Sequence, residues 1–542
     1  MSTNALAPHA ARAKRLWRRA PRNAVLAVIV LIASLIVLFG GPRAALVTAF
    51  LVLGGGIAWT SRSLAVARKE YKRQDERERR RVFTAGRDME EIRRLTRHLW
   101  GGFSASTLVE LREFSADPGR RPPARAAALD VIADWHENVG EKDRARGFRY
   151  SAMLADTAPP DRSRRLAFLR DGGQERHFDV LHVSDFCNMG GTTGSNLQEI
   201  EAQTRAGLRS GLLHNPFATQ QTGRPTDPKF NRLLDNELAR YVAPGDRVTC
   251  DLMIIRHPRS VELLRDDLPR IEARRVLLVI NQTPCRYYGD QGRGEKVWDV
   301  SETRRILESW VGEHEWCPIS PMVREALLRH HADELGPVRL STEDWTNIID
   351  LPRWRREERR TPDGTVRIGR HSRDHVSKWP ETRELLEAAY PAGRRREVHV
   401  LGGARSPERL LGGLPDNWVV RGYDTVPVRE FLHGIDVYVY HTSTDLLEAF
   451  GRAPLEAMAS GVPTILPPRF ERVFGEAGLY VEPEGVRACV EALADDPVGY
   501  ERQVEKAWSV LQERFSHDSH LERLRRNGVG TGVIADSYQP NT

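Results

Sequence analysis

The sequence is poor in cysteine, and its few cysteines are not paired along the chain. Five occur in 542 residues, and none forms a Cys-x-x-Cys pair: Cys187, Cys250, Cys285, Cys317 and Cys489. A zinc module needs clustered ligands, and a disulfide framework needs closely spaced cysteines. Both classes are therefore disfavoured, and a reducing cytoplasm is the compartment that fits best.

Aromatic residues are also scarce, at 7% of the chain, while charged residues make up 29% with a net charge of +7. A basic balance is typical of proteins that bind nucleic acid, anionic lipid or phosphorylated small molecules. Much of the positive charge lies in the first hundred residues, beside apolar runs and without interleaved aromatics. This placement disfavours nucleic acid and favours anionic membrane lipid as a partner.

Long apolar runs occur near the N-terminus, at Ala24–Gly41 and Ala44–Trp59. A spanning helix needs about 20 apolar residues, with a range of roughly 17–25, so the first run is long enough and the second is marginal. Gly41-Pro42-Arg43 separates them, since proline cannot continue a helix. We expect a transmembrane hairpin over residues 24–60. A cleaved signal peptide and a re-entrant or interfacial hairpin are the alternatives.

Basic residues flank this hairpin on both outer sides. Arg43 is the one basic residue in the turn, and the flanking ones are Arg12, Lys14, Arg15, Arg18, Arg19, Arg22, Arg62, Arg68, Lys69, Lys72, Arg73, Arg77 and Arg79. By the positive-inside bias both ends face the cytoplasm, which predicts a cell-membrane protein with its folded domains on the cytoplasmic side. The basic stretch after the hairpin is expected to hold anionic lipid, unless it only solvates an exposed helix.

Residues 61–175 are expected to form a helical linker. Ala126–His136 and Glu141–Asp156 have apolar residues at helical spacing, and Gly119–Pro123 and Ala158–Pro160 read as breaks. One such helix pair resembles a tetratricopeptide repeat, but about three repeats are normally needed for stability. A plain helical spacer is the favoured interpretation.

From about residue 177 short apolar runs alternate with helical stretches, which predicts α/β architecture with parallel sheets. The expected strands are 177–184, 247–256, 275–281, 366–370, 397–402, 417–421, 435–441, 461–466 and 478–481, with helices over 196–210 and from 319. The predicted division is a tail (1–23), the hairpin (24–60), the linker (61–175), a Rossmann-like domain (176–352), a second linker (353–364), a second Rossmann-like domain (365–525) and a tail (526–542). Ligands of such sheets bind outside the carboxyl ends of the strands, so the two domains should face a common cleft.

The most informative segment runs from Glu448 to Ile465 (EAFGRAPLEAMASGVPTI). It resembles the E-x7-E motif of retaining glycosyltransferases of the GT-B fold, particularly glycosyltransferase family 4. The resemblance implies that Glu448 and the backbone of Phe450-Gly451 hold the sugar of a nucleotide-sugar donor, and that Glu456 holds its ribose. Carboxylates suit this task because each accepts two hydrogen bonds from a vicinal diol. Two glutamates at this spacing also occur by chance on solvated helices, but the whole segment is far more specific.

A second motif, Ile368-Gly-Arg370 with Lys378 and Trp379-Pro380 after it, resembles the family's strand-end Gly-Arg followed by a lysine. The resemblance implies that Arg370 and Lys378 pair with the donor diphosphate and offset charge on the leaving nucleotide. Arg373 is a candidate third cation. Taken singly, each of these cations is more often a surface residue.

The remaining candidates are weaker. The turn at Gly190-Gly191 is implied to lie near the donor phosphates and the acceptor. Tyr423 is either a nucleobase-stacking residue or a core tyrosine. Many family members carry a histidine after the strand that corresponds to residues 276–280, where this chain has Asn281. His257 is an alternative for that role, although a structural or surface histidine is the more common case.

The resemblance covers residues 178–515 and implies transfer of a sugar, with retention, from an NDP-sugar to a cell-envelope or lipid-linked glycan acceptor. No metal-ligand cluster and no paired-aspartate motif of the metal-dependent kind is found in the sequence, so no cofactor and no metal are expected. Two alternatives remain open, a sugar phosphorylase with the same fold and a non-catalytic GT-B domain acting as a membrane scaffold.

Overall fold

The computed structural model describes residues 86–530, apart from 103, 157, 188–189, 218–225, 290–291, 358–363, 394 and 424. The chain divides into two compact units, Met1–Glu90 and Glu91–Thr542, and the description that follows concerns the second. The hairpin predicted over residues 24–60 lies outside the described residues, as do both tails for most of their length. Among the described helices, none is both long and apolar enough to cross a membrane.

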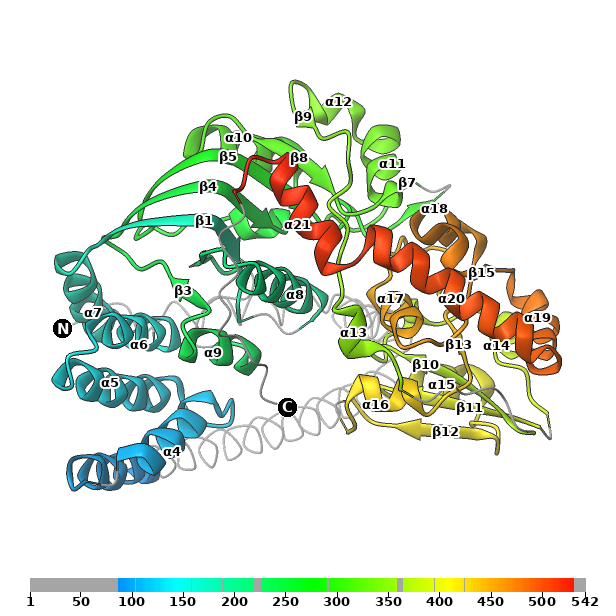
Figure 1. Cartoon of the computed structure of the whole chain (residues 1–542), viewed down its shortest axis with the longest axis horizontal. Coiled ribbons are helices and arrows are strands. Elements are labelled where there is room, and N and C mark those ends of the chain that lie inside the picture. The colour runs from blue at the N-terminus through cyan, green and yellow to red at the C-terminus, as the bar shows by residue number, and fades with distance from the viewer. Residues whose placement is uncertain are drawn as a thin grey trace, which may run out of the picture. The chain divides into compact units, whose positions relative to one another are not determined.

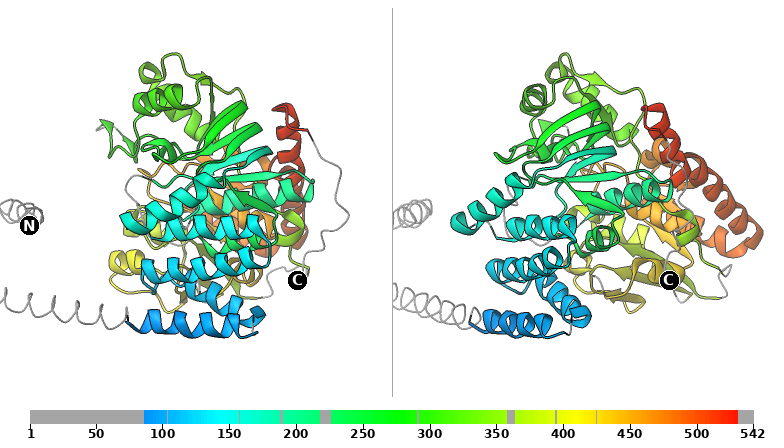
Figure 2. Two further views of the ribbon diagram at one scale, coloured as in Figure 1. Left: turned by 90° about the vertical axis from the view of Figure 1, so that its left-hand side faces the viewer. Right: turned by 60° about the vertical axis from the view of Figure 1, so that its left-hand side comes forward.

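A helix that ends at residue 100 and four further helices form a stack at the start of this unit (Figures 1 and 2). The four further helices are α4 (Ser104–Ala116), α5 (Pro122–Asn138), α6 (Lys142–Ala155) and α7 (Pro159–Asp171). The two predicted breaks are confirmed, since α4 and α6 end before them, and the prolines occupy the first helical positions of α5 and α7. Proline is tolerated there because the first N–H groups of a helix have no intrahelical partner.

The first α/β domain is built on a seven-stranded sheet with the order β3-β2-β1-β4-β5-β8-β9, in which all neighbours are parallel. Its strands are β1 (Glu175–Ser184), β2 (Ser210–His214), β3 (Ala239–Tyr241), β4 (Arg247–Arg256), β5 (Arg270–Ile280), β8 (Glu315–Pro318) and β9 (Arg339–Leu340). Its helices are α8 (Gly191–Arg205), α9 (Pro228–Asp235), α10 (Val300–Trp310), α11 (Pro321–His330) and α12 (Ala332–Leu335). A two-stranded antiparallel pair, β6 (Tyr288–Gly289) and β7 (Gly292–Arg293), extends from it. The second half of β4 is buried throughout, as expected of a parallel strand covered on both faces.

The second α/β domain has a six-stranded parallel sheet with the order β12-β11-β10-β13-β14-β15. Its strands are β10 (Val366–His371), β11 (Arg396–Leu401), β12 (Trp418–Arg421), β13 (Val437–Val439), β14 (Thr464–Leu466) and β15 (Leu479–Tyr480). Its helices are α13 (Leu351–Trp354), α14 (Arg383–Ala389), α15 (Arg405–Leu411), α16 (Val428–His433), α17 (Arg452–Ala459), α18 (Glu471–Phe474), α19 (Val486–Asp495), α20 (Pro497–Arg514) and α21 (His517–Arg526).

Both sheets reverse their strand order beside their first strand, between β1 and β4 and between β10 and β13. Such reversals are the points where open parallel sheets bind ligands. The two Rossmann-like domains of the predicted GT-B architecture are therefore present, and each has one such point.

The last described helix, α21, follows α20 of the second domain along the chain but packs against α8 of the first domain. Gln203 of α8 donates a hydrogen bond from Nε2 to Nε2 of His520 over 3.1 Å. Close by, the fully buried Glu199 pairs with Arg256 and accepts a 2.9 Å hydrogen bond from Nε1 of Trp345. The C-terminal helix thus ties the two α/β domains together through a buried polar network (Figure 1).

Several predicted elements are confirmed, and others begin or end elsewhere. The strand over 247–256 matches β4. The helix predicted from residue 196 begins five residues earlier, at Gly191, inside the glycine-rich turn. Strands β2 and β8 were not predicted, because each has only four or five residues, all of them buried, and so shows no alternating pattern in the sequence.

Candidate functional site

The first glutamate of the motif lies in the loop between β13 and α17. Oε2 of Glu448 accepts hydrogen bonds from Nζ of Lys378 and, over 3.0 Å, from the hydroxyl of Tyr440. Burial opposes ionisation of this carboxyl, but the Lys378 ammonium and the Tyr440 hydroxyl outweigh it and hold the pKa of Glu448 below its usual value. The carboxylate is therefore charged at neutral pH, and its side chain keeps 17% exposure through which a ligand can reach it.

The second glutamate lies inside α17 and has different partners. Oε2 of Glu456 is 3.0 Å from Nε2 of His371, at the carboxyl end of β10, and Oε1 is 2.9 Å from Nε of Arg452. Burial again opposes ionisation, and Arg452 and His371 together lower the pKa of Glu456 below its usual value. The two acids are thus both ionised but are held by separate groups.

Gly451 explains how the chain turns from one acid to the other. It begins α17 with φ of +94°, and a Cβ at this position would lie 2.8 Å from the Phe470 ring. No side chain caps α17, and the partial positive charge at this helix end favours an anionic ligand. The Phe450 ring is 3% exposed and packs against Phe474 and Phe515. Phe450 is therefore a core residue, and the predicted contact of its backbone with the donor sugar stays a prediction.

Arg370 is placed differently from a surface cation. Its side chain is fully buried, and Nη1 donates to the Tyr390 hydroxyl (2.6 Å) and to the carbonyl of His441 (2.8 Å). Nη2 donates to the carbonyl of Lys378, and the guanidinium lies 4.1 Å from the Trp379 ring centroid. Arg370 therefore orders the loop that carries Lys378, and its predicted contact with a diphosphate stays a prediction.

Arg469 is a cation of this site that the sequence analysis missed. Its Nη2 donates to Oγ1 of Thr442 over 2.7 Å, and burial lowers its pKa although the charges of Glu448 and Glu482 act in the opposite direction. The signal in the sequence is its position just after β14, in the turn Pro467-Pro468-Arg469. Together with Lys378 it places two cations beside Glu448. Arg373, in contrast, is exposed.

The first domain meets this site through the glycine-rich turn. Gly190 precedes α8 and Gly191 is its first residue, and no side chain caps the helix. In the first turn of α8, a Cβ on Gly194 would lie 3.0 Å from the guanidinium of Arg452, which itself holds Glu456. The N-termini of α8 and α17 therefore lie close together, and both favour negative charge.

The strand ends next to this turn carry polar side chains. Nδ2 of Asn281, after β5, donates to Oγ1 of Thr192 over 3.1 Å. His257, after β4, adopts φ of +85°, which is rare for a residue other than glycine and is typical of functional sites. It is buried, and Nε2 lies 3.3 Å from Oε1 of Gln282. The structure thus excludes the interpretation of His257 as a surface histidine.

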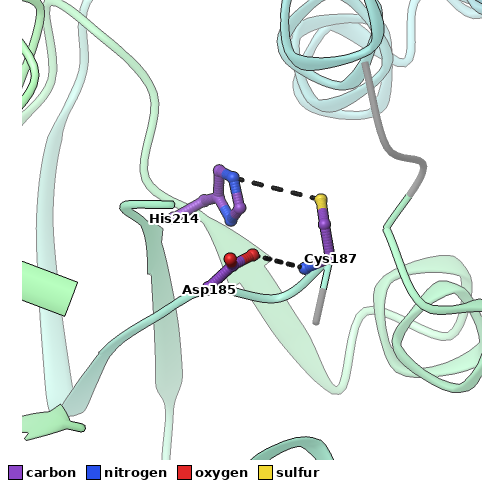
Figure 3. Close-up of side chains that lie close together, drawn as sticks. All are labelled: Asp185, Cys187 and His214. Atoms are coloured by element: carbon purple, nitrogen blue, oxygen red, sulfur yellow. Dashed lines mark hydrogen bonds between the residues drawn. The ribbon is translucent and has the colours of Figure 1, made fainter. Parts of the chain in front are cut away.

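Asp185, Cys187 and His214 gather at the ends of β1 and β2 (Figure 3). Nδ1 of His214 accepts the backbone N–H of Phe186 over 3.2 Å, and burial lowers the pKa of this imidazole to about 3. The neutral ring therefore carries its proton on Nε2, which faces the Cys187 sulfur at 4.0 Å and has no lone pair for a metal. The Asp185 carboxylate accepts the N–H groups of Cys187 and Phe217. Within the described residues, the cluster thus holds the backbone just after β1 through the N–H groups of Phe186 and Cys187.

Tyr423 is 66% exposed, so the interpretation as a core tyrosine is wrong. Stacking on a nucleobase stays a prediction for this residue. Lys378, Glu448, Glu456 and the α17 N-terminus are brought together by the fold, with the α8 N-terminus next to them.

Residues 367–495, which contain this site, match the family model described as glycosyl transferases group 1. The matched residues lie within the second α/β domain and contain both glutamates of the motif. No curated protein matches the chain. A glycosyltransferase from Rickettsia africae ESF-5 has a similar structure, with a TM-score of 0.45 and 14% identity over 65% of this chain and 99% of that one.

Two further solved structures are similar at lower scores. The Thermobaculum terrenum O-GlcNAc transferase has a TM-score of 0.38 and 17% identity over 82% of this chain and 95% of that one. A variant of S. aureus TarM, in complex with Fondaparinux, alpha-GlcNAc-glycerol and UDP, has a TM-score of 0.35 and 16% identity. The match covers 53% of this chain and 55% of TarM.

Proposed function

We propose that the chain is a membrane-anchored glycosyltransferase that moves a sugar, with retention, from an NDP-sugar to a cell-envelope or lipid-linked glycan acceptor. The observation that carries the proposal is the pairing of Glu448 with Lys378 beside the uncapped N-terminus of α17. This arrangement lies within the residues that match glycosyl transferases group 1. It offers a carboxylate for sugar hydroxyls and a cation for the departing phosphate.

In this proposal the donor lies against the second domain. The donor diphosphate pairs with the Lys378 ammonium, and Arg469 and the α17 amides are further hydrogen-bond donors to it. The Glu448 carboxylate, no longer paired with Lys378, then accepts hydrogen bonds from the sugar hydroxyls. Glu456, held by Arg452 and His371, accepts from the ribose hydroxyls. The acceptor enters over Gly190-Gly191, and the leaving phosphate takes its proton. No metal and no cofactor are invoked.

The experiment is a panel of UDP-, GDP- and ADP-sugars, read by thermal shift on the full chain. One donor is expected to raise the melting temperature, and the Lys378→Met variant is expected to lose that rise. Lys506→Met, a change at a partly exposed lysine paired with Glu476, is the control. If no donor shifts the melting temperature of the membrane-embedded protein, the non-catalytic scaffold replaces this proposal.

A further inference from the structure

A cavity of about 470 Å³ lies between the helical stack and the edge of the seven-stranded sheet. Its walls come from α4, α5 and α6 on one side and from α9 and β3 on the other, elements that lie next to one another in Figures 1 and 2. None of its lining residues belongs to the candidate transfer site. Ligand pockets are typically about 300–1,000 Å³, so the cavity is large enough for a small organic molecule.

Apolar side chains from all five elements form one wall of the cavity: Leu108, Ile132, Phe148, Leu234 and Tyr241. The polar atom of this wall, the Tyr241 hydroxyl oxygen, is already hydrogen-bonded to Oγ1 of Thr226 over 2.8 Å. Burial raises the pKa of Tyr241, so this phenol stays neutral. The wall therefore suits the apolar body of a ligand, whose burial stabilises a complex by about 25 cal/mol per Å² of apolar surface.

The arginines that line the cavity are matched by acids. The ion pairs are Arg144–Glu141 (3.4 Å), Arg144–Glu237 (3.1 Å), Arg146–Asp246 (2.8 Å), Arg176–Asp143 (2.9 Å), Arg240–Asp143 (3.1 Å) and Arg240–Glu237 (3.2 Å). The fifth arginine, Arg112, lies over the Phe148 ring with its guanidinium carbon 4.4 Å from the ring centroid. Glu113 is a further acid of the lining. When the partners Glu141 and Asp246 from outside the lining are counted, five arginines face five acids, and the site carries no net charge.

This balance of charge decides which kind of ligand the cavity favours. An ion that entered it would lose its hydration and would meet arginines and acids whose charges already offset one another. An uncharged molecule has a much smaller desolvation cost and leaves the ion pairs intact. The cavity is therefore suited to an uncharged ligand.

Two polar groups of the lining are available to orient such a ligand. The side-chain amide of Asn231, on α9, makes no hydrogen bond within the described part of the chain. His136 donates from Nδ1 to Oε2 of Glu141 over 2.6 Å, and burial lowers the pKa of this imidazole, so the ring is neutral and Nε2 carries a lone pair. Among the described residues, Nε2 of His136 has no hydrogen-bond partner either. A hydroxyl group can both accept from the amide and donate to the imidazole, so it is the polar group that fits either residue.

We propose that this cavity binds an uncharged alcohol, which carries one hydroxyl group on an apolar body. The apolar body lies against the wall that includes Phe148 and Tyr241, and the hydroxyl pairs with the Asn231 amide or with Nε2 of His136. The site is separate from sugar transfer and does not depend on the function proposed above. Its occupancy stabilises the contact between the helical stack and the first α/β domain.

Calorimetric titration of the full chain in lipid nanodiscs tests this site, with empty nanodiscs as the blank for uptake by lipid. The probe is 2-phenylethanol, and the charged controls are phenylacetate and 2-phenylethylammonium, which have the same apolar ring. The alcohol is expected to bind at least tenfold more tightly than either ion. Equal or tighter binding of an ion would overturn the assignment of an uncharged ligand. Displacement of 2-phenylethanol by dihexanoylglycerol would identify an uncharged lipid as the natural ligand, and failure of this two-chain lipid to compete would identify a soluble alcohol.

Two variants locate the binding. Gly147 of α6 lines the cavity, and a Cβ there meets nothing within 4 Å, so Gly147→Leu is expected to fold and to fill the space. It should weaken binding of 2-phenylethanol at least tenfold, whereas Gly147→Ala should leave it within twofold. Asn231→Leu, which keeps the size of the side chain but removes its amide, should weaken binding about three- to tenfold, the effect of one lost hydrogen bond, in contrast to Asn236→Leu at an exposed position. No saturable binding, or an affinity unchanged in both Gly147→Leu and Asn231→Leu, would overturn the proposal.

Discussion

The two glutamates of the motif, although eight residues apart, are held by different partners, and this difference gives them separate tasks. Glu448 is paired with the ammonium of Lys378. Because the lysine side chain is flexible, this ammonium can leave the carboxylate and pair with a phosphate instead. Glu456 is held from two sides by Arg452 and His371, so its carboxylate is fixed in place. A fixed acceptor suits recognition of ribose, and an exchangeable pair suits the reacting end of a donor.

Glu456→Ala is expected to weaken nucleotide-sugar binding about ten- to a hundredfold. The physical reason is the loss of a hydrogen bond to a charged group, which contributes about 1.5–3 kcal/mol. Titration calorimetry with the cognate donor measures the effect. Glu471→Ala, at an exposed acid in α18, should leave the affinity unchanged. An unchanged affinity in Glu456→Ala would remove this residue from the ribose site.

Lys378→Met is expected to lower kcat/KM for nucleotide release at least a hundredfold, or about 2.7 kcal/mol, because the cation that offsets the leaving phosphate is gone. A steady-state assay of the released nucleotide gives the value. A rise in KM alone, with kcat preserved, would mean that Lys378 binds the donor without acting on the departure of phosphate.

At the scale of single elements, the sequence predicts those features that depend on a local pattern of residues. The apolar run of β4 and the glycine that begins α17 are both readable, because burial and turn geometry leave a periodic or residue-type signal. The burial of Arg370 is not readable, since it depends on Trp379 and Tyr390 reaching it from other elements. Arg469 was missed for the same reason. Its place beside Glu448 arises from the pairing of β13 with β14.

The turn after β11 gives an element-scale prediction. Gly402 has φ of +113°, and a Cβ there would lie 1.9 Å from the carbonyl oxygen of Ser372, in the loop that leads to Lys378. Gly402→Ala should therefore lower the free energy of unfolding by about 2–4 kcal/mol. Gly413→Ala is the matched control, because Gly413 also has positive φ but its Cβ would meet nothing within 4 Å. Its expected cost is about 1 kcal/mol. Urea denaturation followed by circular dichroism compares the two, and equal losses would refute the role assigned to the Ser372 contact.

At the scale of the whole molecule, the transmembrane hairpin over residues 24–60 is a prediction that a deletion can test. Deletion of residues 1–60 is expected to release the protein from membranes, because the two apolar runs supply the burial in lipid. Sedimentation with vesicles that contain anionic lipid measures this release. Continued sedimentation of the shortened chain would show that other segments bind lipid.

The buried histidines make the stability of the folded domains depend on pH. Burial lowers the pKa of His520 and of His257 to about 3, whereas an unfolded histidine titrates near about 6.5. The unfolded chain therefore binds more protons below pH 6.5, and stability is expected to fall as the pH drops from about 6.5 toward about 3. At pH 5 the His520→Gln variant should take up about one proton fewer on unfolding than the parent. A pH dependence of unfolding that His520→Gln leaves unaltered would contradict this assignment.

The central claim, that the second domain splits a nucleotide sugar, is tested most directly by the release of nucleoside diphosphate from the donor that the thermal-shift panel selects. The full chain in nanodiscs is incubated with that donor, and the release rate is compared between the parent and Glu448→Gln, which keeps the shape of the side chain but removes its charge. The account predicts steady release by the parent and at least a hundredfold slower release by the variant. Equal rates in both proteins would contradict the account, since the reaction would then not depend on the site.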